Sequence, residues 1–286
     1  MSERPDGGIL ALLREVYAEW SKDNALSLGA ALAYYTVFSL APLLVLVIAM
    51  AGLVFGRKAA EGQIVAQLAD LLGQSAAETV QGMIARASRP AAGALATVMS
   101  LATMALGASG VFGQLQQALN QIWEVGRGTR RGFRGQLKQR AATFGMILGI
   151  GFLLLVSLVL SAALAALHDF LAEYLPLASR LLPVLNFALS FAIIAALFAM
   201  IFKVLPDVYM HWRDVWPGAA VTALLFTVGK TLIAVYLGRA GVTSVYGAAG
   251  SLVLILLWVY YSAQILLIGA EFTEVYSRRY GSRRGA

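Results

Sequence analysis

Six long apolar segments dominate the chain, and charged residues gather between them. The segments run from Ala25 to Phe55, Ala91 to Phe112, Ala141 to Leu167, Pro183 to Leu205, Pro217 to Leu237 and Ser251 to Ala270. Each can cross a bilayer, which takes about 20 mostly apolar residues. All 15 acidic residues lie outside these segments or at an edge, because charge is costly in hydrocarbon. The pattern predicts an all-α polytopic membrane helix bundle with about six transmembrane helices.

Two shorter amphipathic stretches flank the first apolar segment. Within residues 1–24, apolar side chains recur at helical spacing, with charges on the other faces: Ile9, Leu12, Leu13, Val16, Tyr17 and Trp20. This helix would either lie on the cytoplasmic leaflet or pack on the bundle. In the first extracytoplasmic loop, residues 56–90, Gly73 is expected to separate two amphipathic helices. We expect one membrane domain over residues 25–275, followed by a basic cytoplasmic tail, 276–286.

The basic residues predict the orientation. With both termini in the cytoplasm, most of the 22 lysine and arginine residues fall on the cytoplasmic side, as the positive-inside rule requires. The cytoplasmic loop 113–140 is expected to contact anionic lipid headgroups through Arg127, Arg130, Arg131, Arg134, Lys138 and Arg140. Since orientation already explains this charge, we expect no nucleic-acid partner.

Composition removes several kinds of chemistry. Only 13% of the residues are charged, against roughly 25% in soluble domains. Without cysteine, and with two histidines far apart in sequence, the chain offers no pattern typical of a metal site. Nucleophile-elbow and phosphate-loop motifs are also absent. We therefore expect no cofactor, no metal and no enzyme.

One charged residue lies well inside an apolar segment. Lys230 is about 20 Å from the cytoplasmic boundary of its segment, at ~1.5 Å per residue. Such a residue suggests a functional site, although its side chain could also reach the outer interface. Tyr260, Tyr261 and Gln264 lie at a similar depth or deeper. A lysine in a wet cavity would attract an anionic lipid or solute.

The first apolar segment carries a polar patch beside a proline. The patch consists of Tyr34, Tyr35, Thr36 and Ser39, and Pro42 follows it. Proline frees a backbone carbonyl, which neighbouring helices or cavity water must satisfy. The patch therefore indicates either the wall of a polar path or ordinary helix packing with buried hydroxyls.

Several groups of residues, in order along the chain, resemble the signatures of the YihY/BrkB family. They include Pro42; Asn120 and Trp123; Pro206 and Asp207; Pro217 and Gly218; Tyr246 and Gly247; and Gly269 and Glu271. The resemblance implies a six-helix protein of the bacterial cytoplasmic membrane. Members have been called virulence factors, were once mislabelled a tRNA-processing ribonuclease, and have been linked to envelope lipid or lipopolysaccharide handling.

Three functions remain open from the sequence. The first is a transporter or lipid-translocating protein of envelope homeostasis, with membrane lipids as partners and an anionic lipid or solute as substrate. The second is a scaffold that docks an envelope complex through residues 56–90. The third, a membrane-embedded enzyme, is the least favoured, because no apolar segment contains an acid or a histidine well inside it.

Overall fold

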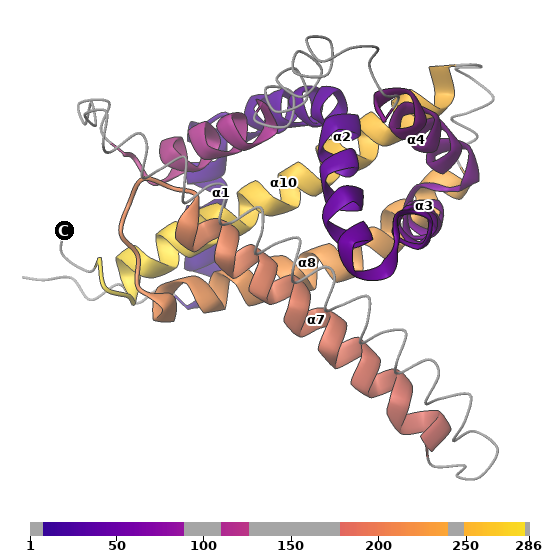
Figure 1. The fold of residues 1–286 in the computed structure, drawn as a ribbon. Coiled ribbons are helices and arrows are strands. Elements are labelled where there is room, and N and C mark those ends of the chain that lie inside the picture. The colour runs from indigo at the N-terminus through magenta and orange to yellow at the C-terminus, as the bar shows by residue number, and fades with distance from the viewer. Residues whose placement is uncertain (1–7, 89–109, 126–177, 240–248, 284–286) are drawn as a thin grey trace, which may run out of the picture.

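The computed structural model describes residues 8–88, 110–125, 178–239 and 249–283, and the regular structure in these ranges is helical (Figure 1). The helices are α1 (Ile9–Lys22), α2 (Ala25–Phe55), α3 (Arg57–Leu72), α4 (Gln74–Ala87), α7 (Ala178–Val204), α8 (Trp212–Arg239) and α10 (Gly250–Arg279). Residues 110–122 form a further helical stretch. The expected polytopic all-α bundle is confirmed.

Four helices of the described part are long and apolar enough to span a membrane. Their spanning portions are Ala25–Ala49, Val184–Val204, Trp212–Ile233 and Gly250–Arg279. They correspond to the first, fourth, fifth and sixth segments expected from the hydropathy pattern. The expected spans at 91–112 and 141–167 lie outside the described residues, apart from 110–112. The total of six therefore stays a prediction.

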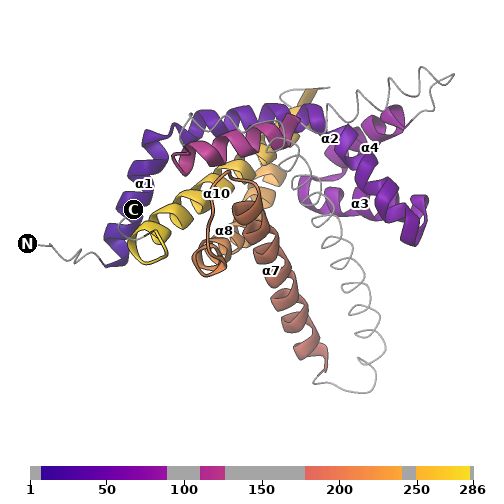
Figure 2. The same ribbon diagram turned by 60° about the vertical axis from the view of Figure 1, so that its left-hand side comes forward.

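Helix α10 is the hub of the described bundle. It packs against α8, α2, α1 and α4, and it runs between α2 and α8 in both ribbon views (Figures 1 and 2). Its buried Leu267 and Ala270 belong to a core cluster that includes Trp123 and Phe202. Because α10 is surrounded in this way, different sides of it contact different helices.

The crossing of α8 and α10 depends on two glycines and two threonines. A Cβ atom at Gly218 would lie 1.8 Å from Oγ1 of Thr273, and one at Gly269 would lie 1.8 Å from Oγ1 of Thr222. Each threonine hydroxyl donates to its own helix, Thr222 to the Gly218 carbonyl and Thr273 to the Gly269 carbonyl, both at 2.7 Å. Small residues let helices approach closely inside a membrane, which explains the glycines of the two signatures.

A second pair of signature residues fixes the connection between α7 and α8. Asn120 donates from Nδ2 to Oδ2 of Asp207 at 3.0 Å, and the Asp207 amide donates to Oδ1 of Asn120 at 2.7 Å. Beside this pair Gln116 donates to the Leu205 carbonyl at 3.0 Å. The reciprocal hydrogen bonds attach the helical stretch 110–122 to a non-helical segment that would otherwise leave polar backbone groups unpaired.

The two amphipathic stretches both form helices. Helix α1 packs Leu12 and Val16 on Val275 of α10, as the bundle-packing alternative predicted. Gly73, with φ +85°, separates α3 from α4 as expected. Helix α4 turns its apolar side chains toward α2 and α10, where Val80 joins a cluster with Val37, Ile48 and Ile255. Helices α3 and α4, over residues 57–87, are thus folded back onto the bundle.

Candidate functional site

The site is built on one side of α10, which we call the polar face: Tyr260, Gln264, Glu271, Glu274 and Arg278. Separations of three, four and seven residues place side chains on the same side of a helix. From Tyr260 to Arg278 the polar face extends about 27 Å along the axis, at ~1.5 Å per residue. This length is comparable with a hydrocarbon core of about 30 Å, so the polar face cannot lie wholly among headgroups.

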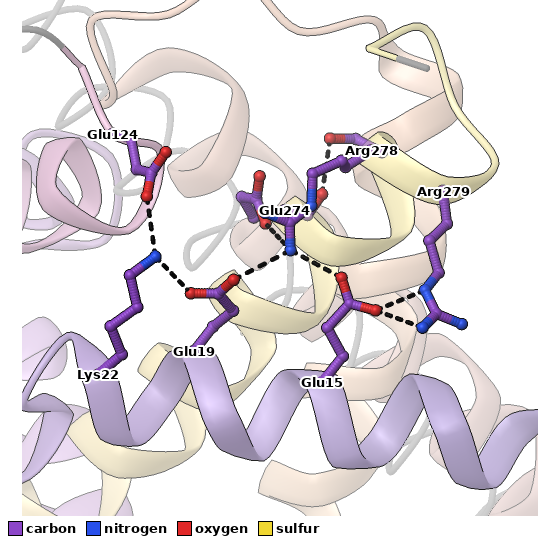
Figure 3. A network of polar contacts seen from close by, with 8 residues as sticks. Glu15, Glu19, Lys22, Glu124, Glu274, Arg278 and Arg279 are labelled. Carbon is purple, nitrogen blue, oxygen red and sulfur yellow. Dashed lines mark hydrogen bonds and ion pairs between the residues drawn. The ribbon is translucent and has the colours of Figure 1, made fainter. Parts of the chain in front are cut away.

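The polar face begins at an ion-pair network with α1 (Figure 3). Arg278 contacts Glu15 at 2.8 Å, Glu19 at 3.2 Å and Glu274 at 3.7 Å. Arg279 donates from Nε to Glu15 at 2.6 Å. These contacts join the first and last described helices, so we call this the terminal end of the bundle. Helix α1 and the last turns of α10 therefore lie together at one end of the bundle.

Lys22 extends the network to the stretch that follows residues 110–122. Its ammonium contacts Glu19 at 2.8 Å and Glu124 at 3.0 Å. The hydrogen bond to Glu19 raises the pKa of Lys22, and it lowers the pKa of Glu19 in turn. Asp23 behaves in the opposite way, because burial raises its pKa and the nearby Lys22 offsets this only in part. At the terminal end, the folded structure therefore favours the charged form of Glu19 and disfavours the charged form of Asp23.

Glu271 lies beyond this network, deeper along the polar face. Only 1% of its surface is exposed. Its carboxyl group interacts with those of Asp23, Glu274 and Glu19, and it shares a hydrogen bond with the Asp23 side chain. Its Oε1 atom has no hydrogen-bond partner among the described residues. A buried carboxyl oxygen with no donor is costly unless water or a ligand supplies one.

Gln264 continues the polar face into the contact with α2. Its Nε2 atom donates to the Ala25 carbonyl at 3.2 Å, while its buried Oε1 has no partner in the described structure. The side chain fits because α2 has a glycine opposite: a Cβ at Gly29 would lie 2.0 Å from Nε2. The Tyr260 ring approaches the same glycine. Tyr260 and Gln264 therefore share the α2 side of α10.

Two indole groups lie in the same cluster. Trp123 belongs to the core cluster that also contains Leu267 and Ala270, which precede Glu271 on α10, and Trp20 packs against that cluster. The Nε1 atoms of both tryptophans are buried without a partner among the residues described. Together with Gln264 and Glu271, this part of the bundle holds two unpaired donors and two unpaired acceptors. Such groups are rare in native structures and indicate bound water or a polar ligand.

Tyr261 lies on the side of α10 that faces α8, the helix that carries Lys230. A Cβ at Gly229 would lie 2.1 Å from the Tyr261 hydroxyl, so Tyr261 reaches the residue next to Lys230. Lys230 itself is half-buried. Tyr260 and Tyr261, although adjacent in sequence, thus face different helices. We predicted a polar path shared by Lys230, Tyr260 and Gln264, and this stays a prediction.

The patch on α2 is divided between two environments. Tyr34 and Tyr35 are exposed and contact each other edge to face, with ring centroids 5.7 Å apart. Ser39 is buried near Gly110, and Thr36 is half-buried. Pro42 lies within the continuous helix α2. The structure brings both Ser39 and the Tyr35 ring toward Gly110, at the start of the helical stretch 110–122.

The remaining predicted residues are structural or fall outside the described ranges. Pro206 is buried beside the Asn120–Asp207 pair, and Pro217 lies near the start of α8. Tyr246, Gly247 and the basic loop residues Arg127, Arg130, Arg131, Arg134, Lys138 and Arg140 lie outside the described residues. Within the described ranges, no group of three or more histidine, aspartate or glutamate side chains could hold a metal ion.

In a comparison with known protein families, residues 16–286 match the family described as virulence factor BrkB. The chain belongs to the virulence factor BrkB family. This BrkB-family protein is 28% identical to a UPF0761 membrane protein of Aeromonas salmonicida over 94% of its own length and 89% of the relative's. It is 30% identical to one of Verminephrobacter eiseniae and 28% identical to one of Stenotrophomonas maltophilia, covering 57% and 59% of those longer chains. No solved structure matches it.

These relatives establish a membrane protein with apolar helices, consistent with a bacterial inner membrane. Their names describe them as membrane proteins and state no catalytic activity. Reasoning from the sequence of this BrkB-family protein missed Asp23, Trp20 and the role of Glu271 in the site. One signal was available, because Glu271 lies seven residues after Gln264 and therefore on the same side of α10.

Proposed function

We propose that this protein is a transporter or lipid-translocating protein of the bacterial inner membrane, with its termini in the cytoplasm. The polar face of α10 would form one wall of its path. The observation that carries the proposal is the set of unpaired buried polar atoms at Gln264 and Glu271. Packing alone would favour apolar side chains there, since an unpaired buried polar atom costs about 1–3 kcal/mol.

The position of these atoms supports a path rather than an isolated defect. Tyr260 and Gln264 lie against Gly29, and Glu271 lies about 10 Å further along α10 toward the terminal end, at ~1.5 Å per residue. The ion-pair network then leads to solvent. A continuous series of polar groups from water into a spanning helix is typical of ion and substrate pathways.

Thiol accessibility tests this path directly, because the chain contains no cysteine. Gln264→Cys is expected to react with a charged, membrane-impermeant methanethiosulfonate in reconstituted vesicles. Val228→Cys, on an exposed apolar position of the spanning helix α8, is the matched control and should not react. If Gln264→Cys is as inert as Val228→Cys, the polar face is dry and the path is rejected.

Two further assays distinguish lipid movement from solute movement and test the role of Lys230. Translocation of a fluorescent phosphatidylglycerol in proteoliposomes, followed by dithionite quenching, distinguishes lipid movement from solute movement. Gln264→Leu should slow whichever movement occurs. Complementation of a deletion strain with Lys230→Leu tests the predicted role of the lysine, and full activity would remove Lys230 from the mechanism.

A scaffold remains the alternative. It requires a docking surface on the 56–90 region, but α4 directs Val80 and Ile84 into the bundle, where both are buried. Thr79 also donates to the Ser251 hydroxyl at 2.8 Å. A partner would have to bind the polar side of α3 and α4. Loss of function on altering exposed residues there, with Gln264→Cys inert, would favour the scaffold.

A further inference from the structure

Helix α1 has two apolar faces, and the bundle covers only one. Leu12 and Val16 pack on α10. A second face, which we call the outer face of α1, carries Ile9, Leu10, Leu13 and Tyr17, with exposed fractions of 77%, 78%, 50% and 69%. Ile9, Leu13 and Tyr17 follow one another at intervals of four residues and so lie in one row. Water is a poor solvent for a continuous apolar row of this kind.

The orientation of α1 is fixed independently of this face. Glu15 and Glu19 pair with Arg278 and Arg279 of α10. Because these acids lie on the α10 side of α1, the helix cannot rotate to bury its outer face without breaking the ion pairs. The outer face therefore needs an occupant other than the described bundle.

The chain connectivity locates the outer face at the edge of the membrane. Helix α1 ends at Lys22, and the spanning portion of α2 begins at Ala25. Asn24, in a left-handed conformation with φ 53°, turns the chain between them. Leu26, at the start of the span, is itself an exposed apolar residue. The same medium that surrounds α2 thus reaches α1.

Exposed aromatic residues mark the same level on other helices. Tyr209, Trp212 and Trp216 are exposed around the start of α8, and Tyr280 is exposed just after α10. The hydrogen bond from the Ser282 amide to Asp214 shows that these two helix ends are adjacent. Tyrosine and tryptophan gather at the boundary between lipid and water. The exposed Arg14 next to the outer face adds a charge suited to lipid phosphate.

We propose that the outer face of α1 rests in the headgroup–acyl boundary of the leaflet at the terminal end, while the opposite side of the helix stays ion-paired to α10. The partner is therefore a phospholipid surface. An amphipathic helix in this position buries its apolar side about 5–10 Å below the headgroups. The contact does not depend on what the protein transports.

Site-specific fluorescence tests the proposal in the full-length chain, which has no cysteine to compete for the label. Leu13→Cys and the matched control Ala18→Cys, both at exposed positions, are labelled with the fluorophore NBD. The protein is reconstituted in phosphatidylethanolamine–phosphatidylglycerol vesicles. At position 13 we expect blue-shifted emission and several-fold stronger quenching by lipids spin-labelled near the headgroup than at position 18.

Two results would overturn the proposal. Equal, water-like emission at both positions would mean that the outer face is solvated. Blue-shifted emission at position 13 that spin-labelled lipids do not quench would mean that protein covers it, and energy transfer between labelled copies would then identify a second chain. Neither result bears on the thiol reactivity of Gln264→Cys, so this proposal and the transport path fail or stand separately.

Discussion

The crossing of α8 and α10 allows a stability prediction from atomic distances. In Gly269→Ala, the new Cβ would lie 1.8 Å from Oγ1, 2.8 Å from Cβ and 2.9 Å from Cγ2 of Thr222. Carbon atoms pack best at about 3.5–4.0 Å, so all three contacts are too short. Thr222 cannot rotate away without losing its hydrogen bond to the Gly218 carbonyl. Overpacking of this kind costs typically about 1–3 kcal/mol, and we expect that loss.

The same substitution elsewhere provides the control. A Cβ at Gly62, within α3, would meet nothing within 4 Å. Gly62→Ala should therefore stabilise the protein by about 0.4–1 kcal/mol, because alanine restricts the unfolded chain. The free energy of unfolding of both variants would be measured in detergent micelles by denaturant titration with circular dichroism. The two substitutions are expected to have opposite signs.

A compensating substitution identifies the cause. Thr222→Gly removes the atoms that the new methyl group meets, so Gly269→Ala/Thr222→Gly moves the small residue from one helix to the other. We expect a favourable coupling free energy of about 1 kcal/mol or more between the two changes in a double-mutant cycle. If Gly269→Ala proves as harmless as Gly62→Ala, or if the changes simply add, the close approach of α8 and α10 is wrong.

Three other predictions concern the terminal end and the α7–α8 connection. Asn120→Leu should destabilise the protein by about 1–3 kcal/mol, because it removes both hydrogen bonds between the Asn120 side chain and Asp207, whereas Gln117→Leu, at an exposed position on the same stretch, should change the unfolding free energy little. Asp23→Asn should stabilise the protein at pH 7 and lose this advantage below about pH 3.8, because burial raises the pKa of Asp23 and so penalises its charged form in the folded state. Glu19→Gln should make the free energy of unfolding depend less on pH in the acidic range. The pKa of Glu19 is lowered in the folded state, so its charge contributes full stability above about pH 4.5, and this contribution declines as the pH falls through the pKa of the folded state. Unchanged profiles in equilibrium unfolding from pH 3 to 7 would contradict the last two.

Much of the architecture followed from local pattern. Apolar length alone located α2, α7, α8 and α10, and Gly73 marked the boundary between α3 and α4. These features depend on hydrophobic transfer and backbone conformation, which act over a few residues. The resemblance also selected Asn120 and Asp207, which the structure joins by reciprocal hydrogen bonds.

The arrangement around α10 could not be predicted in the same way. Adjacent Tyr260 and Tyr261 look equivalent in sequence, but one faces Gly29 of α2 and the other Gly229 of α8. Which neighbour each side chain meets depends on how three helices are placed around one axis. Similarly, the burial of Glu271 required knowing that α1 folds back over the end of α10.

The pairing of α1 with α10 has a consequence for biosynthesis. The acidic residues Glu15 and Glu19 are translated well before their arginine partners Arg278 and Arg279, because a sequence separation of 259 or more residues lies between the paired side chains. During insertion α1 therefore stays undocked at the membrane surface, with its acidic side in water, until α10 has been translated. A nascent chain stalled before position 278 would carry this helix undocked, exposing it to surface proteases until release restores the missing partners.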